Sequence, residues 1–189
     1  MKIIVCYVFM VIVMIVLGSN ILVSQSVKVG LRIEPGILFS EQFNQSEINP
    51  VFYSVSANII YEPIKWLGLE IRPGYVSNGE YGGYEIGGFA RIKILPTNIF
   101  LLIGMNNHSN NISNAHNGGG SYVKEMLYKG IGVGYQKDSK LSFDIMYYWT
   151  NNRDYAYSRV TDWQSYSRIV NKQMNGILKL GFNISFTVI

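Results

Sequence analysis

Apolar residues occupy every second position over most of the chain from residue 27 onward. Residues 27–34 set the pattern, because apolar side chains alternate there with charged residues or glycine in the order Val-Lys-Val-Gly-Leu-Arg-Ile-Glu. Successive side chains of a β-strand point to opposite faces, so the pattern predicts strands with one apolar face and one face of small and charged groups. Eight segments carry it, and the predicted strands cover 27–40, 51–62, 67–75, 84–94, 99–106, 127–136, 141–150 and 178–188.

The connections between these strands alternate between short and long. Short connections are predicted at 62–66, 95–98 and 137–140, and long ones at 41–50, 76–83, 107–122 and 151–173. Short turns at one end and long loops at the other are typical of an outer-membrane barrel, whose strands cross the membrane in about 9–11 residues. The sequence therefore predicts an all-β fold, an eight-stranded antiparallel transmembrane β-barrel.

The strands of soluble barrels also alternate between apolar and polar residues, but three further features favour the membrane barrel. Charged residues recur in the middle of the strands, with glycine on the same face. Most of the strands are about 10 residues long, whereas strands of soluble proteins average about 5–6. Aromatic residues mark the ends of the apolar face, and Tyr53 and Tyr61 of one strand are separated by about 20 Å of height at a tilt of roughly 40°.

The segment before the first strand has the composition of a secretory signal peptide. Lys2 precedes an uncharged apolar run at 3–17, and small residues follow up to Ser24-Gln25-Ser26. A basic start, an apolar middle and a small-residue end predict a signal peptide at 1–26 and a barrel domain at 27–189, with cleavage after Gly18 as an alternative site. An uncleaved anchor is the competing interpretation, but the apolar run is short of the roughly 20 residues that a membrane helix needs.

Composition narrows the partners that the mature chain can have. The single cysteine, Cys6, lies in the predicted signal peptide, which leaves no cysteine for a disulfide or a thiolate metal site. Without Lys2 the 16 basic residues fall to 15 against 12 acidic ones, a net charge of +3 that is scattered along the chain. We expect no nucleic acid partner, no metal and no cofactor.

An internal repeat places charges on the inward face of the barrel. Residues 29–36 read Val-Gly-Leu-Arg-Ile-Glu-Pro-Gly and residues 67–74 read Leu-Gly-Leu-Glu-Ile-Arg-Pro-Gly, so the two charges exchange places. Buried charges need partners, and the exchange predicts Arg32–Glu70 and Glu34–Arg72 pairs. These four residues would belong to one lumenal network with five further charged residues, Glu85, Arg91, Lys93, Asp144 and Lys179.

Bulky residues also share the inward face. The alternation turns six of them towards the lumen: Phe52, Phe89, Phe100, Tyr128, Met146 and Tyr148. An eight-stranded barrel has an interior that side chains of this size can fill. We therefore expect no continuous water channel, and the glycines of 130–134 are interpreted as bare positions beside these bulky groups.

The sequence resembles the small eight-stranded outer-membrane β-barrel proteins over nearly the whole mature chain. The most specific similarity lies at 181–186, where Gly181, Ile184 and Phe186 resemble the signal that the barrel-assembly machinery recognises. The resemblance implies that machinery as a partner during insertion, and outer-membrane lipid and lipopolysaccharide as the surroundings of a monomer. Members of this family act as tethers, adhesins, narrow pores or lipid-modifying enzymes, so the fold alone does not give the function.

One loop contains residues that could carry hydrolytic chemistry. The outer-membrane lipid A deacylases carry a His-x-Ser-Asn motif, and His108-Ser109-Asn110 resembles it without the intervening residue. A histidine beside a serine can act as its general base, which makes Ser109 and Ser113 candidate nucleophiles and Glu125 a candidate orienting carboxylate. The alternative interpretation is a polar surface loop, because consecutive residues of a regular strand face opposite sides.

The last long connection combines aromatic and basic residues. Tyrosine, tryptophan and arginine favour binding surfaces and contact with lipid phosphates, so the candidates for binding are Arg153, Tyr155, Arg159, Trp163 and Arg168. We predict a structural or interaction role through the outer loops. The alternatives are a lipid A ester hydrolase using His108 and, third, a narrow channel.

Overall fold

The computed structural model describes residues 25–111, 118–161 and 167–188. Twelve β-strands lie in these ranges: β1 (Ser26–Ile33), β2 (Gly36–Gln42), β3 (Gln45–Val51), β4 (Tyr53–Ile64), β5 (Leu67–Ser77), β6 (Gly83–Lys93), β7 (Ile99–Asn110), β8 (Gly119–Ser121), β9 (Lys124–Gln136), β10 (Leu141–Trp149), β11 (Asp154–Thr161) and β12 (Ser167–Thr187). Among the described residues, no helix is long and apolar enough to cross a membrane. The predicted signal peptide lies almost entirely outside the described residues.

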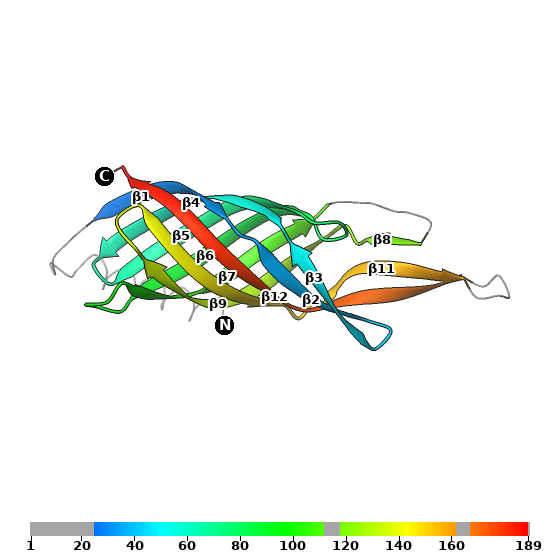
Figure 1. The fold of residues 1–189 in the computed structure, drawn as a ribbon. Helices are drawn as coiled ribbons and strands as arrows, with labels where there is room; N and C mark the ends of the chain where they lie inside the picture. Colours follow the sequence, from blue (N-terminus) through cyan, green and yellow to red (C-terminus); the bar gives the residue numbers. More distant parts are fainter. Residues whose placement is uncertain (1–24, 112–117, 162–166, 189) are drawn as a thin grey trace, which may run out of the picture.

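Eight strands close into a barrel (Figure 1), in the order β1-β4-β5-β6-β7-β9-β10-β12. The ring closes because β12 pairs antiparallel with β1, from Arg32 opposite Asn183 to Lys28 opposite Thr187. Every neighbouring pair around the ring is antiparallel. The predicted all-β, eight-stranded antiparallel barrel is therefore confirmed.

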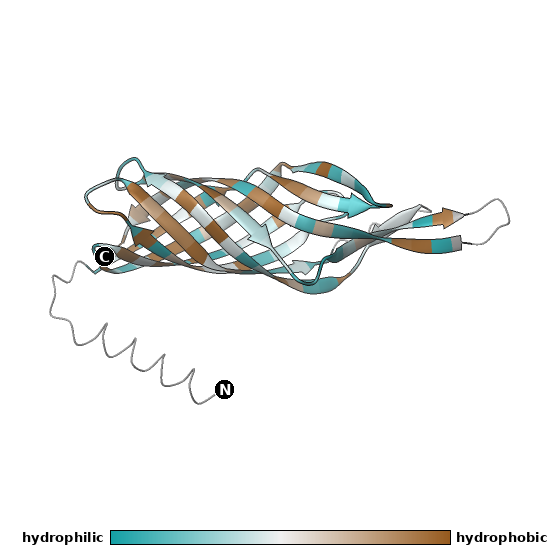
Figure 2. Ribbon diagram, turned by 90° about the horizontal axis from the view of Figure 1, so that it is seen from below, coloured by the Kyte–Doolittle hydropathy of each residue, from teal (hydrophilic) through white to brown (hydrophobic). Residues whose placement is uncertain are grey.

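The barrel is apolar outside and polar inside. Figure 2 shows hydrophobic positions recurring along the barrel strands, and these side chains are exposed on the outer wall. The buried positions between them carry charged, amide and hydroxyl groups. A closed barrel leaves no unpaired strand edge, and an apolar outer wall around a polar interior suits the hydrocarbon of a bilayer. The protein is an outer-membrane β-barrel.

Two rows of aromatic residues mark the edges of the apolar wall, and all of them are exposed except Trp149, which is half-buried. The row nearer the long loops, which we call the outer row, consists of Tyr53, Tyr75, Tyr84 and Trp149; the inner row consists of Tyr61, Tyr135 and Phe186. Tyr75 and Tyr84 touch edge to face, with ring centroids 5.2 Å apart. Aromatic girdles of this kind lie at the two membrane interfaces. In such barrels the short turns face the periplasm, so the loop end of this barrel is the extracellular end.

The wall continues beyond the membrane on one side only, as a sheet with the order β3-β2-β12-β11-β8. This sheet corrects two predicted loops, because 41–50 is largely the β2–β3 hairpin and 151–173 is largely the pairing of β11 with β12. Phe43 and Asn44, with φ of 53° and 58°, form the two-residue turn of the first hairpin. The predicted strand 27–40 already covered β2 up to Ser40. β3 and β11 face no lipid and lack a regular apolar alternation, so the pattern did not reveal them.

Phe52 is the one bulky residue whose predicted inward orientation is wrong. The wall is interrupted at this residue, between β3 and β4, and the Phe52 side chain is 65% exposed. The break shifts the phase of the alternation, so parity counted from β4 does not apply to it. The other five residues of the predicted set are all buried, at most 5% exposed.

Glycines make room for these bulky groups and for one charge. Side chains of Tyr148, Met146 and Phe100 lie over Gly130, Gly132 and Gly134 respectively, which confirms the interpretation of that glycine run. At Gly181 a Cβ atom would overlap the guanidinium group of Arg32. Gly181 therefore opens the path by which Arg32 crosses the lumen.

We expect Gly181→Ala to lower the free energy of unfolding by about 1–3 kcal/mol, because the added methyl group displaces a buried, paired arginine. Gly88→Ala is the matched control, since a Cβ atom at Gly88 meets nothing within 4 Å. Urea unfolding of the refolded protein in detergent micelles measures both. Equal stability of the two variants would contradict this role for Gly181.

Candidate functional site

A network of buried ion pairs fills the middle of the lumen. Arg32 binds Asp144 with both terminal nitrogens, at 2.5 and 2.6 Å, and its Nε lies 2.6 Å from Glu34. Arg72 lies 2.8 Å from Glu70 and 3.5 Å from Glu34. All five side chains are at most 5% exposed. Bidentate arginine–carboxylate pairs are the strong form of this contact, and they close the barrel to solvent.

The predicted pairing of the repeat is half right. The Glu34–Arg72 pair is present at 3.5 Å. Arg32, however, takes Asp144 and Glu34 as partners in place of Glu70, which pairs with Arg72 on its own strand. Asp144 comes from β10, far along the sequence, and no repeat marks it. The exchange of charges between two strands therefore revealed the members of the network but not all of its contacts.

The remaining predicted members lie towards the two ends of the lumen. Arg91 stacks on the Phe100 ring at 3.6 Å and lies 3.9 Å from Glu70. Lys93 belongs to a separate cluster near the inner row, where Glu62 forms ion pairs with Lys93, at 2.6 Å, and with Lys28, at 3.2 Å. Towards the loop end, Lys179 lies 2.6 Å from Glu85.

His108 lies inside the barrel and not in a loop. β7 continues to Asn110, and His108 is fully buried, with Nδ1 3.2 Å from Glu85 Oε1. The Tyr81 ring stacks on the imidazole at a centroid distance of 4.1 Å, and the Tyr81 hydroxyl donates to Glu85 at 3.3 Å. Tyr81 thereby covers the lumenal network on its extracellular side.

The structure does not bring the predicted hydrolytic residues together. Ser109 follows His108 on β7 and faces the opposite side, where its register partner on β9 is Glu125. Glu125 is exposed on the outer wall, whereas His108 is enclosed in the lumen. Ser113 lies outside the described residues. His108 is sealed from Ser109 and from lipid, so it cannot act as the general base of Ser109 in this conformation.

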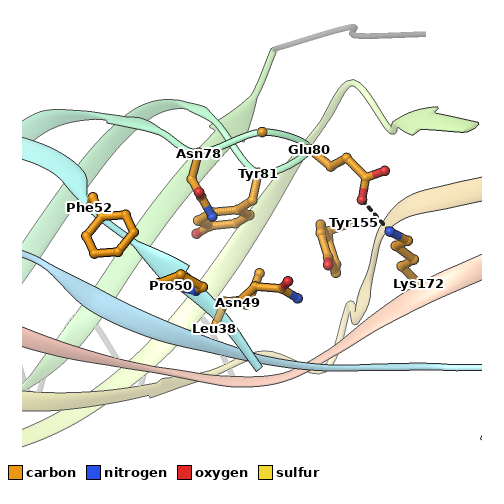
Figure 3. Close-up of a pocket in the computed structure, with 10 residues that line it drawn as sticks. Leu38, Asn49, Pro50, Phe52, Asn78, Glu80, Tyr81, Tyr155 and Lys172 are labelled. Carbon is orange, nitrogen blue, oxygen red and sulfur yellow. Dashed lines mark hydrogen bonds and ion pairs between the residues drawn. The ribbon is translucent and has the colours of Figure 1, made fainter. Parts of the chain in front are cut away.

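A cavity of about 260 Å³ opens above Tyr81 at the mouth of the barrel (Figure 3). β2 and β3 supply one wall and the connection between β5 and β6 supplies the other. The wall of β2 and β3 contributes Leu38, Asn49 and Pro50, and the opposite wall contributes Asn78, Gly79, Glu80 and Tyr81. Phe52 lies at one end of the view, and Tyr155 and Lys172 lie towards the other. We call this space the mouth cavity.

An ion pair joins β12 to the wall of the mouth cavity that the β5–β6 connection supplies. Lys172 of β12 reaches Glu80 at 2.8 Å, drawn as a dashed line in Figure 3. Burial opposes the charge on Lys172, but the hydrogen bond and the negative charge of Glu80 outweigh it and raise the pKa of the lysine. The pair is partly exposed, so its contribution to stability is modest.

Asn110 holds three segments together beneath the cavity. Its side chain is 1% exposed, and its oxygen accepts from the Gly82 backbone at 2.9 Å. Its nitrogen donates to the carbonyl oxygens of Tyr122 at 2.9 Å, Tyr155 at 3.3 Å and Glu80 at 3.5 Å. The polarity of Asn110 was visible in the sequence, but its partners were not, because they come from connections that carry no periodic signal.

The predicted binding residues of the last connection separate in space. Tyr155 is buried and lines the mouth cavity, with its ring 6.2 Å from that of Tyr81 in an edge contact. Arg153 donates to the Met174 carbonyl oxygen at 2.9 Å on the outer wall. Arg159 and Arg168 are exposed, farther out on β11 and β12. Trp163 lies outside the described residues.

The predicted assembly signal lies on the closing strand. Ile184 and Phe186 of β12 are 51% and 55% exposed on the lipid-facing wall, and Gly181 faces the lumen. Recognition of these residues by the assembly machinery stays a prediction.

No protein-family model and no curated protein matches the sequence. Among solved structures, neisserial surface protein A (NspA) is similar with a TM-score of 0.45 and 15% identity over 84% of this chain and 97% of that one. The N-terminal β-barrel domain of Pseudomonas aeruginosa OprF is similar with a TM-score of 0.45 and 13% identity over 84% of this chain and 97% of that one. The outer membrane protein OprG of the same organism is similar with a TM-score of 0.42 and 8% identity over 87% of this chain and 97% of that one. The evidence for a membrane barrel is the closed ring and apolar wall of this chain.

A pair of double-mutant cycles tests which carboxylate Arg32 binds. We expect Arg32→Met with Asp144→Asn to show a coupling energy of about 2 kcal/mol, because the two side chains share a bidentate contact. The cycle with Glu70→Gln should give a clearly smaller coupling, since Arg32 and Glu70 belong to one network but share no direct contact. Urea unfolding in micelles supplies all the values, and a larger coupling to Glu70 would contradict the observed pairing.

Asn110→Leu should loosen the mouth while leaving the barrel closed. The substitution removes the Asn110 hydrogen bonds to the carbonyl oxygens of Glu80 and Tyr122 and to the Gly82 N–H, whereas the Tyr155 oxygen keeps the Tyr122 N–H at 2.9 Å. Each lost buried hydrogen bond costs about 1 kcal/mol. We expect faster hydrogen exchange at 78–82 and 155–156, with unchanged exchange in β1. Asn107→Leu, on the opposite face of the same strand, is the control.

Proposed function

We propose that this outer-membrane barrel is a recognition protein, which binds a small ligand in the mouth cavity from the extracellular side. The observation that supports the proposal is a shaped cavity, held by Asn110 and the Glu80–Lys172 pair, above a lumen that buried ion pairs fill. A site of this kind needs walls that keep their positions without a ligand. The pairing of β2 with β3 holds one wall, and the Asn110 hydrogen bonds hold the other.

The lining of the mouth cavity indicates the chemistry of the ligand. Apolar and aromatic groups come from Leu38, Pro50, Phe52 and Tyr155, and ligand sites are mainly lined in this way. Side-chain amides of Asn49 and Asn78 and the charges of Glu80 and Lys172 supply polar groups that fix orientation. The volume is near the lower end of the range for ligand pockets, so a molecule of monosaccharide or amino-acid size fits best.

The buried network also bears on the two alternatives. A channel would need a water-filled path, and the middle of the lumen holds buried bulky side chains and buried, paired charges. A hydrolase would need its general base at the lipid surface, and His108 has no exposed surface. Neither alternative has an observation in its favour among the described residues.

Phe52 allows the proposal to be tested without disturbing the fold. It lines the mouth cavity but is 65% exposed, so truncation removes contact with a ligand and little packing. We expect at least one member of a panel of free monosaccharides and amino acids to bind the refolded protein in saturation-transfer NMR. Phe52→Ala should weaken that binding about tenfold or more, which is the loss expected when an aromatic contact is removed.

Phe43→Ala is the matched control, because Phe43 is 51% exposed at the tip of the β2–β3 hairpin and does not line the mouth cavity. Binding should be unchanged in this variant. The proposal fails if no member of the panel binds, or if Phe52→Ala and Phe43→Ala bind as the parent does.

A further inference from the structure

Lys129 is a charged residue on the lipid-facing wall. It belongs to β9, where it shares the exposed face with Leu127, Ile131, Val133 and Tyr135. Its register partners are Met105 on β7 and Trp149 on β10, and Trp149 belongs to the outer row. Among the described lipid-facing positions from the inner row up to the outer row, Lys129 is the one that carries a formal charge.

The cost of such a lysine depends on its depth. A lysine on the lipid face of a barrel costs about 2–4 kcal/mol at the midplane and about 0–1 kcal/mol near an interface. Beside Trp149, at the level of the outer row, the ammonium group of Lys129 meets the headgroups of the outer leaflet and not their acyl chains. The anionic groups of that layer are the available counterions.

The neighbours of Lys129 form a pocket and not a flat wall. A hollow of about 360 Å³ is bounded by Lys129 and Trp149 below and by Glu125, Asn151 and Asn152 above. The Thr150 hydroxyl accepts from the Asn152 backbone at 3.1 Å, and Lys124 donates to the Asn152 side chain at 2.8 Å. These bonds shape the connection after β10, so the amide groups have defined positions. We call this space the wall pocket.

The ammonium group of Lys129 is available to a ligand. The ion pairs of the described residues use other lysines, namely Lys28, Lys93, Lys172 and Lys179. Glu125 is the carboxylate of the wall pocket, and it lies four residues from Lys129 along one strand, about 13 Å at about 3.3 Å per residue. A ligand can therefore place an anionic group at Lys129 and neutral hydrogen-bond donors near Glu125.

We propose that the wall pocket binds the headgroup of a phosphorylated glycolipid of the outer leaflet. A phosphate group binds Lys129 through charge-assisted hydrogen bonds. A sugar ring lies against Trp149, and its hydroxyl groups donate to Glu125 and exchange hydrogen bonds with Asn151 and Asn152. The acyl chains then run down the apolar wall of β9 and β10. The site is separate from the mouth cavity and does not depend on the proposed function.

Native mass spectrometry of the full refolded chain in detergent tests the wall pocket. The probes are a diphosphorylated, acylated glucosamine disaccharide (lipid A), its dephosphorylated form, phosphatidylglycerol and inorganic phosphate. We expect the parent to retain lipid A. It should bind the dephosphorylated form and phosphatidylglycerol at least about tenfold more weakly than lipid A. Inorganic phosphate at millimolar concentration should not displace lipid A.

Variants separate a specific site from a general attraction to anions. Lys129→Gln should weaken lipid A binding about tenfold or more, and Lys129→Arg should retain it, because both lysine and arginine bind phosphate. Lys137→Gln is the matched control, since Lys137 is an exposed lysine in the turn at the opposite end of the barrel. Its binding should equal that of the parent.

Four results would overturn the proposal. Equal lipid A binding by Lys129→Gln and the parent would exclude Lys129 as the phosphate ligand. Equal loss in Lys137→Gln would indicate attraction to net charge alone. Equal binding of phosphatidylglycerol would remove the sugar from the recognised group, and displacement by inorganic phosphate would reduce the site to one for phosphate alone.

Discussion

The bidentate contact between Arg32 and Asp144 connects the parts of the barrel that the chain itself does not connect. Arg32 comes from the first strand and Asp144 from β10, and β12 separates them in the ring. A buried guanidinium without a partner would cost several kcal/mol, so both groups must be in place when the lumen closes. Gly181, the residue of β12 that lies opposite Asp144 in the register, has no side chain because the arginine occupies that space.

The same contact explains why the interior can be charged and still be closed. Glu34, Glu70, Arg72 and Asp144 surround Arg32, and each charge has an opposite charge within 4 Å. Aromatic rings from Phe89 and Phe100 lie against Arg72 and Arg91 at 4.3 and 3.6 Å, which excludes water from their faces. The packed interior thus forms the floor of the mouth cavity. Tyr81 contacts both, because it stacks on His108 in the lumen and lines the cavity.

Much of the barrel could be predicted from the sequence because the membrane imposes the pattern. Residues such as Leu69 and Ile71 face lipid and Glu70 and Arg72 face the lumen, so parity alone assigns them. Parity fails where lipid no longer acts on one face, which is why residues 41–50, the tip of the β2–β3 hairpin and most of β3, were expected to be a loop and Phe52 to point inward. The mouth cavity could not be predicted at all, since Asn110, Glu80 and Lys172 are ordinary polar residues until the fold brings them together.

β12 gives the site a dependence on the order of assembly. This single strand of 21 residues pairs with β1 and then β2 along one edge, and with β10 and then β11 along the other. It also supplies Lys172 to the mouth cavity. The cavity cannot exist in a chain that has been inserted but not closed, because the strand that closes the ring is the strand that builds the cavity. A cell that presents this surface therefore displays only barrels whose insertion is complete.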